Sequence, residues 1–396
     1  MVVPDDVRAA LATLPGPVGI ACSGGGDSLG LLHIAYEVRR DLTVLTVDHG
    51  LRREAAQEAE MVAALCDRLR LSHTILPLGL SDGPALMARA RTARYDAMTA
   101  WARKHGVSTI CLGHTQDDVA ETLLMRLSDG VGLDGLAQMA DRFQRGGITF
   151  LRPLLATARR DLRARVVAAG WSPVDDPTND DARFDRARIR KGIATLGLDS
   201  RAIARSAATL RKAQEALDWQ VARIAAEIAQ LDRGDWLIER DALAALPLEI
   251  VRRLLLGGLA WIGGGLHPPR YEEQRTFLDR ARAGQAATLQ GVQLRAEGTR
   301  LRLSREPAAA ARAPEQPVGA VWDTRWCVTG PQGTVRALGE GIADIIDWRA
   351  AGLPRSSLIA GPAVWDGHTL LGTPLLPGGP WTATCRDPFA RSDTCR

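Results

Sequence analysis

Lysine is scarce in this chain of 396 residues, which contains 50 lysine and arginine residues in total. Only Lys104, Lys191 and Lys212 are lysines, so none precedes residue 104. A Walker A loop needs a lysine directly after its last glycine. The glycine-rich segment near the start of the chain therefore cannot belong to an ordinary P-loop nucleoside triphosphatase.

Paired cysteines and long apolar runs are also missing. None of the six cysteines forms a C-x-x-C pair, which argues against a zinc ribbon or an iron–sulfur site. No stretch approaches the roughly 20 apolar residues that span a bilayer. The first residues carry Asp5, Asp6 and Arg8 and lack the apolar segment of a signal peptide. We therefore expect a soluble cytoplasmic protein without membrane attachment, and the length predicts two or three domains.

Basic residues are concentrated in one part of the chain, although the net charge is only +4. Nine lie between Arg183 and Lys212, where only Asp185 and Asp199 oppose them. This local excess indicates a polyanionic partner. A solvated helix face explains the charge equally well.

The first ~150 residues alternate short apolar runs with longer amphipathic stretches, as doubly wound parallel α/β sheets do. The predicted strands are Val18–Cys22, Thr43–Val47, His73–Pro77, Ser108–Leu112 and Ile148–Leu151. The predicted helices are Ser28–Arg40, Glu54–Leu69, Pro84–Lys104, Asp117–Leu127 and Ala158–Ala169. The fold class is therefore α/β.

The rest of the chain predicts a helical connector and smaller α+β domains. A helical pattern runs from Ser200 to Gln230, followed by an apolar helix at Pro247–Trp261. Two strands are expected at Ala287–Leu294 and Thr299–Ser304. We place a catalytic domain at 1–198, a connector and substrate-binding domain at 199–306, a linker at 307–316 and a C-terminal domain at 317–396.

The strongest motif is Ser23-Gly24-Gly25-Gly26-Asp27-Ser28, between the first strand and the first helix. Glycines let backbone N–H groups surround an anion, and the start of a helix adds a favourable dipole. Ser23 and Ser28 add hydroxyl groups, whereas Asp27 would repel phosphate unless Mg²⁺ lies between them. The G-x-G-x-x-G spacing of a Rossmann fold is absent. The segment predicts a phosphate-binding loop rather than a simple turn.

This loop resembles the SGGxDS motif of the PP-loop, or N-type, ATP pyrophosphatases, which cleave ATP to AMP and pyrophosphate. Further segments resemble one branch of that superfamily, the tRNA(Ile)-lysidine synthetases, in unbroken order from residue 18 to about 190. They are Val47–Arg52 (VDHGLR), Ala90–Tyr95 (ARTARY), Gly113–Thr122, Gly132–Leu136, Leu151–Leu154 and Asp175–Asn179. The family pattern R-N-R-I-R-H reads Arg186-Ala187-Arg188-Ile189-Arg190-Lys191 here, which leaves any role of its Asn and His in doubt.

Two carboxylates, Asp118 and Glu121, share one face of the helix after the fourth strand because they are three residues apart. His114 precedes this helix at the carboxyl end of a strand, where ligands bind in open α/β sheets. The carboxylates could hold Mg²⁺ or the ammonium group of lysine. Helix capping by Asp117 or Asp118 is the structural alternative. The direct role of His114 stays open.

The resemblance implies a two-step reaction on isoleucine tRNA with the CAU anticodon. Oxygen O2 of the wobble cytidine attacks the α-phosphate of ATP, and the amine of L-lysine then displaces AMP from C2. The implied catalytic residues are Asp27, His114, Asp118 and Glu121. The loop Ser23–Ser28 would hold pyrophosphate, with Asp27 acting through Mg²⁺, and Asp48 would line the adenosine side. Contacts to phosphate or tRNA are expected from Arg91, Arg94, Arg152, Arg186, Arg188 and Arg190.

Two other functions remain open. A tRNA thiolase on the same fold would use reactive cysteines or C-x-x-C clusters, which this chain lacks. A catalytically silent RNA-binding protein would have a broken phosphate loop, and this loop is intact. The oligomeric state, including a homodimer, is not specified by the sequence.

Overall fold

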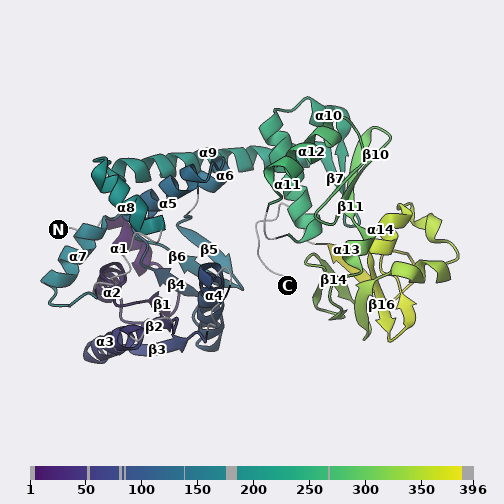
Figure 1. The fold of residues 1–396 in the computed structure, drawn as a ribbon. Helices are drawn as coiled ribbons and strands as arrows, with labels where there is room; N and C mark the ends of the chain where they lie inside the picture. The colour runs from purple at the N-terminus through teal and green to yellow at the C-terminus, as the bar shows by residue number, and fades with distance from the viewer. Residues whose placement is uncertain are drawn as a thin grey trace. The chain divides into compact units, whose positions relative to one another are not determined.

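The computed structural model describes residues 5–50, 54–79, 83, 86–137, 139–174, 185–265 and 268–385. The chain divides into two compact units, Met1–Gln214 and Glu215–Arg396, coloured from purple to teal and from teal to yellow in Figure 1. The predicted segments Leu51–Arg52 and Asp175–Asn179 lie outside the described residues.

The first unit is built on a six-stranded sheet in the order β3-β2-β1-β4-β6-β5. All neighbouring pairs are parallel except β5 with β6. The strands are β1 (Val18–Ala21), β2 (Leu42–Asp48), β3 (Ser72–Pro77), β4 (Thr109–Leu112), β5 (Arg142–Arg145) and β6 (Ile148–Leu151). The doubly wound α/β sheet that the apolar pattern predicts is confirmed.

Helices cover both faces of this sheet, so its central strands β1 and β4 are buried on both sides. The helices of the unit are α1 (Asp5–Ala12), α2 (Gly26–Val38), α3 (Glu54–Leu69), α4 (Leu86–Lys104), α5 (Gln116–Ser128), α6 (Leu133–Leu136), α7 (Arg159–Ala168), α8 (Asp185–Thr195) and the first part of α9 (Ser200–Ile228). One face packs Ile20 and Val44 against α1, α2, α3 and α7. The other packs Leu45 and Phe150 against α4, which lies across the sheet in Figure 1.

The strand order reverses between β1 and β4, and this creates the point where open α/β sheets bind ligands. The two strands end at Ala21 and Leu112. A Cβ atom on Gly113 would lie 3.0 Å from Cα of Ser28 and 3.1 Å from the carbonyl oxygen of Asp27. Only glycine lets the end of β4 approach the start of α2 this closely.

From Asp185 onward, the basic segment forms two helices, α8 and the start of α9. Ala207 of α9 is buried against Val119 and Leu123 of α5. The side chains of Arg201 and Arg205 are exposed. Arg201 and Arg205 are therefore exposed on a helix that packs beside α5.

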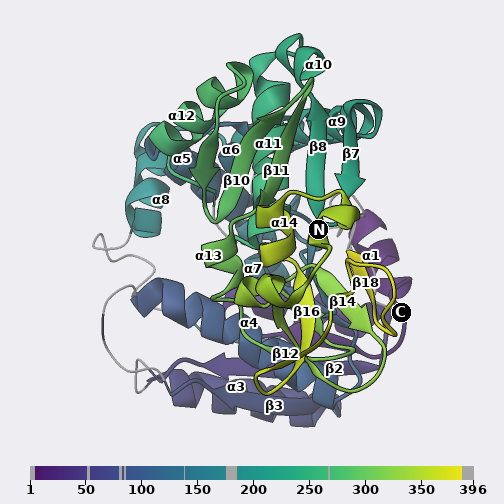
Figure 2. The same cartoon turned by 90° about the vertical axis from the view of Figure 1, so that its right-hand side faces the viewer.

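The second unit contains a five-stranded antiparallel sheet in the order β7-β8-β11-β10-β9, and Figure 2 shows its central strands side by side. Its elements are β7 (Ala229–Asp232), β8 (Asp235–Glu239), α10 (Arg240–Ala244), α11 (Leu248–Gly263), α12 (Tyr271–Arg282), β9 (Ala287–Leu289), β10 (Val292–Glu297) and β11 (Arg300–Arg305). Leu254 and Leu259 of α11 pack against the sheet, which buries Leu294 and Leu303.

The prediction of one strand over Ala287–Leu294 was wrong. A tight turn divides it into β9 and β10, which pair with each other as an antiparallel hairpin. Gln290 and Gly291 both have positive φ angles, +48° and +74°. That conformation is typical of two-residue hairpin turns whose second residue is glycine.

Two smaller sheets complete the second unit, in the orders β12-β15-β16-β17 and β13-β14-β18. The elements are α13 (Pro307–Ala310), β12 (Gln316–Pro317), β13 (Val321–Trp322), β14 (Trp326–Thr329), β15 (Thr334–Ala337), the 3₁₀ helices η2 (Gly339–Asp344) and η3 (Trp348–Ala351), α14 (Arg355–Ala360), β16 (Pro362–Asp366), β17 (Thr369–Gly372) and β18 (Thr382–Cys385). Composition predicts a linker at 307–316, where Ala309 and Ala310 of α13 are buried.

A buried ion pair joins strands of this unit to α14. Asp235 accepts hydrogen bonds from Arg302 at 2.9 Å and from the hydroxyl of Ser357 at 2.5 Å. Burial raises the pKa of Asp235 to about 6.

In the part of the chain that the structure describes, no helix is both long and apolar enough to cross a membrane.

Candidate active site

The glycine-rich loop is held in shape by its own serine residues. The hydroxyl of Ser28 accepts a hydrogen bond from the backbone N–H of Ser23 at 3.1 Å and donates one to the carbonyl oxygen of Gly25 at 3.0 Å. Gly24 has a φ of +86°, which favours glycine, and its carbonyl oxygen accepts from the N–H of Val174 at 3.0 Å. The loop is therefore fixed before any ligand binds.

Helix α2 begins within this loop, at Gly26, and its N-cap residue Gly25 contributes no side chain to the first N–H groups. The N–H groups at the start of a helix and the helix dipole favour an anion. Ser23, Gly24, Gly25, Gly26 and Ser28 thus lie where the sequence predicts a phosphate-binding loop.

Helix α5 holds its carboxylates by a capping arrangement. One oxygen of Asp118 accepts hydrogen bonds from the N–H of Thr115 at 2.8 Å and from its hydroxyl at 2.9 Å. Burial opposes ionisation of Asp118, but the charge of Arg159 and the bond from Thr115 outweigh it and lower the pKa of Asp118. Capping and a site role are both compatible with this geometry, because the second oxygen faces a cluster of arginines.

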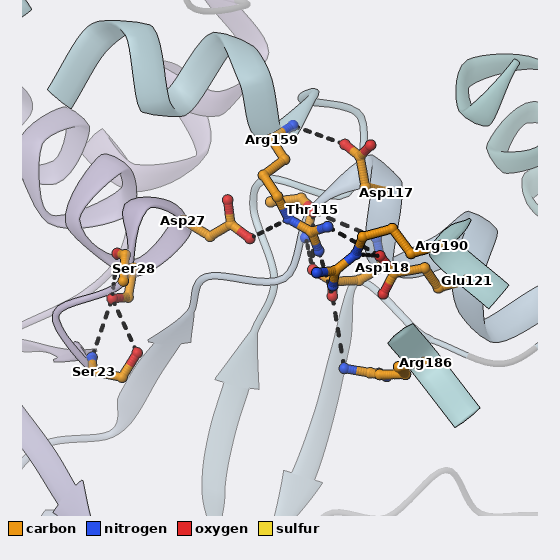
Figure 3. A network of polar contacts seen from close by, with 11 residues as sticks. Ser23, Asp27, Ser28, Thr115, Asp117, Asp118, Glu121, Arg159, Arg186 and Arg190 are labelled. Atoms are coloured by element: carbon orange, nitrogen blue, oxygen red, sulfur yellow. Dashed lines mark hydrogen bonds and ion pairs between the residues drawn. The ribbon is translucent and has the colours of Figure 1, made fainter. Parts of the chain in front are cut away.

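Arg159, the first residue of α7, connects the loop to α5 (Figure 3). Its Nε donates to Asp27 at 2.9 Å, one terminal nitrogen donates to Glu121 at 3.0 Å, and the other donates to Asp118 at 3.1 Å. Its backbone N–H donates to Asp117 at 2.8 Å. A single guanidinium group is therefore shared by three carboxylates.

Helix α8 supplies two further arginines to the same cluster. Arg190 donates to Glu121 at 2.9 Å, on the oxygen that Arg159 also contacts, and Arg186 lies 3.7 Å from Asp118. They are four residues apart and so share a helix face. Arg188 instead forms an ion pair with Asp185, and its side chain is 57% exposed. The structure thus brings two of the three predicted arginines of this helix to the carboxylates.

Two buried carboxylate oxygens in the cluster have no hydrogen-bond partner among the described residues: Oδ1 of Asp27 and Oε2 of Glu121. The Glu121 side chain is only 2% exposed. Burial raises the pKa of Asp27 in spite of the opposing charge of Arg159. A buried acceptor without a partner is costly, so both oxygens are available for a cationic or hydrogen-bonding ligand.

His114 follows β4 and accepts a hydrogen bond at Nδ1 from Nε of Arg152 at 3.2 Å. The Arg152 guanidinium also lies 4.6 Å from the ring of Phe143. Burial lowers the pKa of His114 to about 3, so its imidazole is neutral at physiological pH. The hydrogen bond from Arg152 places the ring proton on Nε2.

The other predicted residues lie on neighbouring elements. Arg91 and Arg94 are on α4, and the guanidinium of Arg91 lies 5.4 Å from the centre of the Tyr95 ring. The pKa of Arg94 is lowered by burial and by the positive charges of Arg91, Arg186 and Arg152. Asp48 ends β2, and its carboxylate accepts from the N–H of Gly50 at 2.9 Å.

The sequence did not predict Arg159 as a residue of the site. It lies in the segment Ala158-Arg159-Arg160-Asp161, where no motif distinguishes it from Arg160. Arg159 and Asp27 are 132 residues apart in the chain. The only sequence signal was its position at the start of a predicted helix beyond the fifth strand.

Comparison with known proteins identifies the group to which the chain is related. Residues 12–196 match the PP-loop domain family. A tRNA(Ile)-lysidine synthase of Ruegeria pomeroyi is 43% identical over 93% of this chain and 91% of its own length. Another, from Novosphingobium aromaticivorans, is 42% identical over 74% of this chain and 90% of its own length. The chain belongs to the tRNA(Ile)-lysidine synthase family.

Membership of the tRNA(Ile)-lysidine synthase family confirms the predicted resemblance, and the PP-loop domain supports the use of ATP. Among solved structures, the U34-tRNA thiolase NcsA of Methanococcus maripaludis has a TM-score of 0.45 and 15% identity. The similarity covers 52% of this chain and 77% of the thiolase. The roles of the individual site residues remain predictions.

Proposed function

We propose that this enzyme joins lysine to C2 of the wobble cytidine of isoleucine tRNA with the CAU anticodon, and that it converts ATP to AMP and pyrophosphate. The observation that carries the proposal is the pair of partnerless buried oxygens, on Asp27 and Glu121, in one arginine-bridged cluster beside the phosphate loop. This arrangement suits an amine that must react next to a phosphate. Kinship with tRNA(Ile)-lysidine synthases along almost the whole chain supports the same reaction.

The loop at the start of α2 would bind the pyrophosphate half of ATP through its N–H groups. In the first step, O2 of the cytidine attacks the α-phosphorus, the bond to the β-phosphate oxygen breaks, and pyrophosphate leaves. Donors that already point at the phosphates stabilise the charge that develops in this step. The neutral His114 lies just beyond the adjacent strand β4, and Arg152, which donates a hydrogen bond to it, follows β6.

Asp27 fits a magnesium ion. Mg²⁺ is usually bound by one or two carboxylates together with substrate phosphates, and Asp27 keeps one buried oxygen without a partner. Asp27 would hold the ion, which would neutralise charge on the phosphates when it is bound.

Asp118 and Glu121 form the lysine half of the proposed site. The free oxygen of Glu121 would accept a hydrogen bond from the ammonium group, which must lose a proton before it reacts. In the second step the neutral amine attacks C2, the C2–O2 bond breaks, and AMP departs with the oxygen. The carboxylates are the nearest groups that could take up the released proton.

The tRNA would be held by the basic surfaces of the first unit and by parts of the second. Arg91 and Arg94 of α4, Arg188 of α8 and the start of α9 are the candidates in the first unit. RNA-binding proteins recognise shape and exposed single-stranded bases, which a catalytic pocket alone could not select. Because tRNA, ATP and free lysine are cytoplasmic, we expect the enzyme to act in the cytoplasm.

The test is mass spectrometry of an isoleucine tRNA transcript after incubation with ATP, Mg²⁺ and lysine. We expect one lysyl group on the wobble cytidine, formed together with AMP, and none on a transcript that carries uridine there. Sulfur incorporation from a sulfur donor would instead identify a thiolase. Binding of tRNA without release of AMP would identify a silent RNA-binding protein.

A further inference from the structure

Arg159 belongs to both halves of the proposed site. Its Nε contacts Asp27 at 2.9 Å, on the nucleotide side, and its terminal nitrogens contact Glu121 and Asp118 at 3.0 and 3.1 Å, on the lysine side. It therefore occupies Oε1 of Glu121 and one oxygen of Asp118, beside the Oε2 of Glu121 to which we assign the ammonium group. Figure 3 shows the guanidinium between the two sides.

We propose that Arg159 is a positioning residue that couples the two halves, so that lysine binds well only after ATP has drawn its guanidinium group away from Asp118 and Glu121. The inference rests on the proposed function and deepens it, because it adds an order of binding. An ATP phosphate chain at the start of α2 brings anionic oxygens close to Asp27. Those oxygens compete with Asp118 and Glu121 for the guanidinium.

Arg159 can move in this way without leaving the carboxylates of Asp118 and Glu121 without other polar partners. When Arg159 turns away, Glu121 keeps its 2.9 Å hydrogen bond from Arg190. Asp118 keeps both bonds from Thr115 and the nearby charge of Arg186. These remaining contacts leave each carboxylate with a hydrogen-bonding partner when the ammonium group arrives.

The backbone of Arg159 stays fixed while its side chain can turn. Its N–H is bound by Asp117 at 2.8 Å, which anchors the start of α7 to α5. Its side chain is 28% exposed, so the guanidinium is not enclosed by packing. The fixed backbone and the partly exposed side chain together allow the guanidinium group of Arg159 to turn between the two proposed ligand sites.

Three variants separate coupling from a simple structural role. Arg159→Gln removes the charge. Arg159→Lys keeps the charge but replaces the planar fork by one ammonium group, which cannot contact both sides in the same way. Arg160→Gln is the matched control. Arg160 is the next residue in the chain, its side chain is 82% exposed, and its Nε lies 3.6 Å from Asp161. Thermal unfolding of each variant shows whether it is folded.

The experiment measures binding of radiolabelled lysine to the full chain by equilibrium dialysis, without nucleotide and with magnesium and α,β-methylene-ATP. For the wild type and Arg160→Gln we expect the nucleotide analogue to tighten lysine binding about 5- to 150-fold, the usual range of coupling between sites. For Arg159→Gln the ratio of lysine affinities with and without the analogue should approach one, because lysine already binds more tightly without nucleotide. Arg159→Lys should also lose most of the coupling.

The inference is overturned if the nucleotide analogue leaves the affinity of the wild type for lysine unchanged. It is also overturned if the analogue tightens lysine binding in either folded Arg159 variant as much as in the wild type. A normal ratio in Arg159→Lys alone would mean that charge, not the shared fork, is what matters, which also contradicts coupling by bridging. The proposed function is judged separately by lysidine formation in the wild type. Lysidine formation without coupling between ATP and lysine would contradict only the inference. Absence of lysidine formation in the wild type would contradict the proposed function.

Discussion

At the scale of single residues, the site is a set of carboxylates that each commit one oxygen to arginine. Glu121 receives Arg159 and Arg190 on Oε1 and keeps Oε2 buried without a partner. Removing its charge therefore leaves two guanidinium groups facing a neutral amide. It also removes the acceptor that we assign to lysine.

We expect Glu121→Gln to raise the Michaelis constant for lysine far more than that for ATP. Breaking a buried charged pair costs ~3–5 kcal/mol, which corresponds to a change upward of roughly a hundredfold. Steady-state kinetics with each substrate varied in turn measure the effect. Asp96→Asn is the control, because Asp96 is exposed and pairs with Arg145. An unchanged Michaelis constant and rate for lysine would remove Glu121 from the site.

His114 makes a second prediction at this scale, because burial lowers its pKa to about 3. For a histidine, a lowered pKa means that the charged form appears only in acid, so the imidazole should stay neutral from pH 5 to 8. Nuclear magnetic resonance should show no titration of the His114 ring over that range. The signal can be assigned by its loss in His114→Asn, which keeps an acceptor near Nδ1 for Arg152. A titration near pH 6.5 would contradict this prediction.

At the scale of elements, the site depends on how closely β4 approaches α2. The approach is limited by Gly113, where any Cβ would meet backbone atoms of Asp27 and Ser28 at 3.0–3.1 Å. Backbone atoms cannot rotate aside as the end of a side chain can. A larger residue must therefore shift the start of α2 and with it the phosphate loop.

We expect Gly113→Ala to lower the free energy of unfolding by ~1–3 kcal/mol, the usual cost of overpacking. It should also weaken ATP binding, because the first N–H groups of α2 move. Denaturant unfolding and binding of an ATP analogue measure the two effects. Gly79→Ala is the matched control, since a Cβ there meets nothing within 4 Å. ATP binding as tight as in the wild type would show that the loop tolerates the shift.

At the scale of the whole molecule, the basic segment lies on α8 and the start of α9, next to the carboxylate helix α5. Its arginines divide by direction: Arg186 and Arg190 lie at the carboxylates, whereas Arg201 and Arg205 are exposed. One segment can thus serve both the site and a polyanion. Charge alone did not separate these two uses.

We expect the triple variant Arg201→Gln, Arg205→Gln, Arg211→Gln to bind tRNA more weakly and with a smaller dependence on salt. Each lost phosphate contact should reduce the salt slope by about one unit. Cognate and other tRNAs should be affected about equally, because phosphates carry no sequence information. Filter binding at several salt concentrations provides the measurement. Arg68→Gln with Arg70→Gln, two exposed positions at the end of α3, is the control. An unchanged slope in the triple variant would mark a solvated helix face.

The sequence by itself determined the doubly wound sheet and the place of the phosphate loop. Both follow from local patterns: buried parallel strands read as continuous apolar runs, and a loop such as Ser23–Ser28 binds anions through its own backbone. Local reasoning failed where a turn residue was overlooked, as at Gln290–Gly291. It also left open whether Asp118 caps a helix or serves the site.

Only the tertiary structure decided which arginines meet the carboxylates. Arg159 lies 132 residues after Asp27, and Arg190 lies 69 residues after Glu121. Side chains that far apart are brought together by the parallel pairing of β1 with β4 and by the packing of α7 and α8, which no local pattern encodes. Arg159 and Arg160 are neighbours with the same side chain, but α7 turns one toward three carboxylates and leaves the other 82% exposed. Helix geometry and packing, rather than residue type, give Arg159 its place in the site.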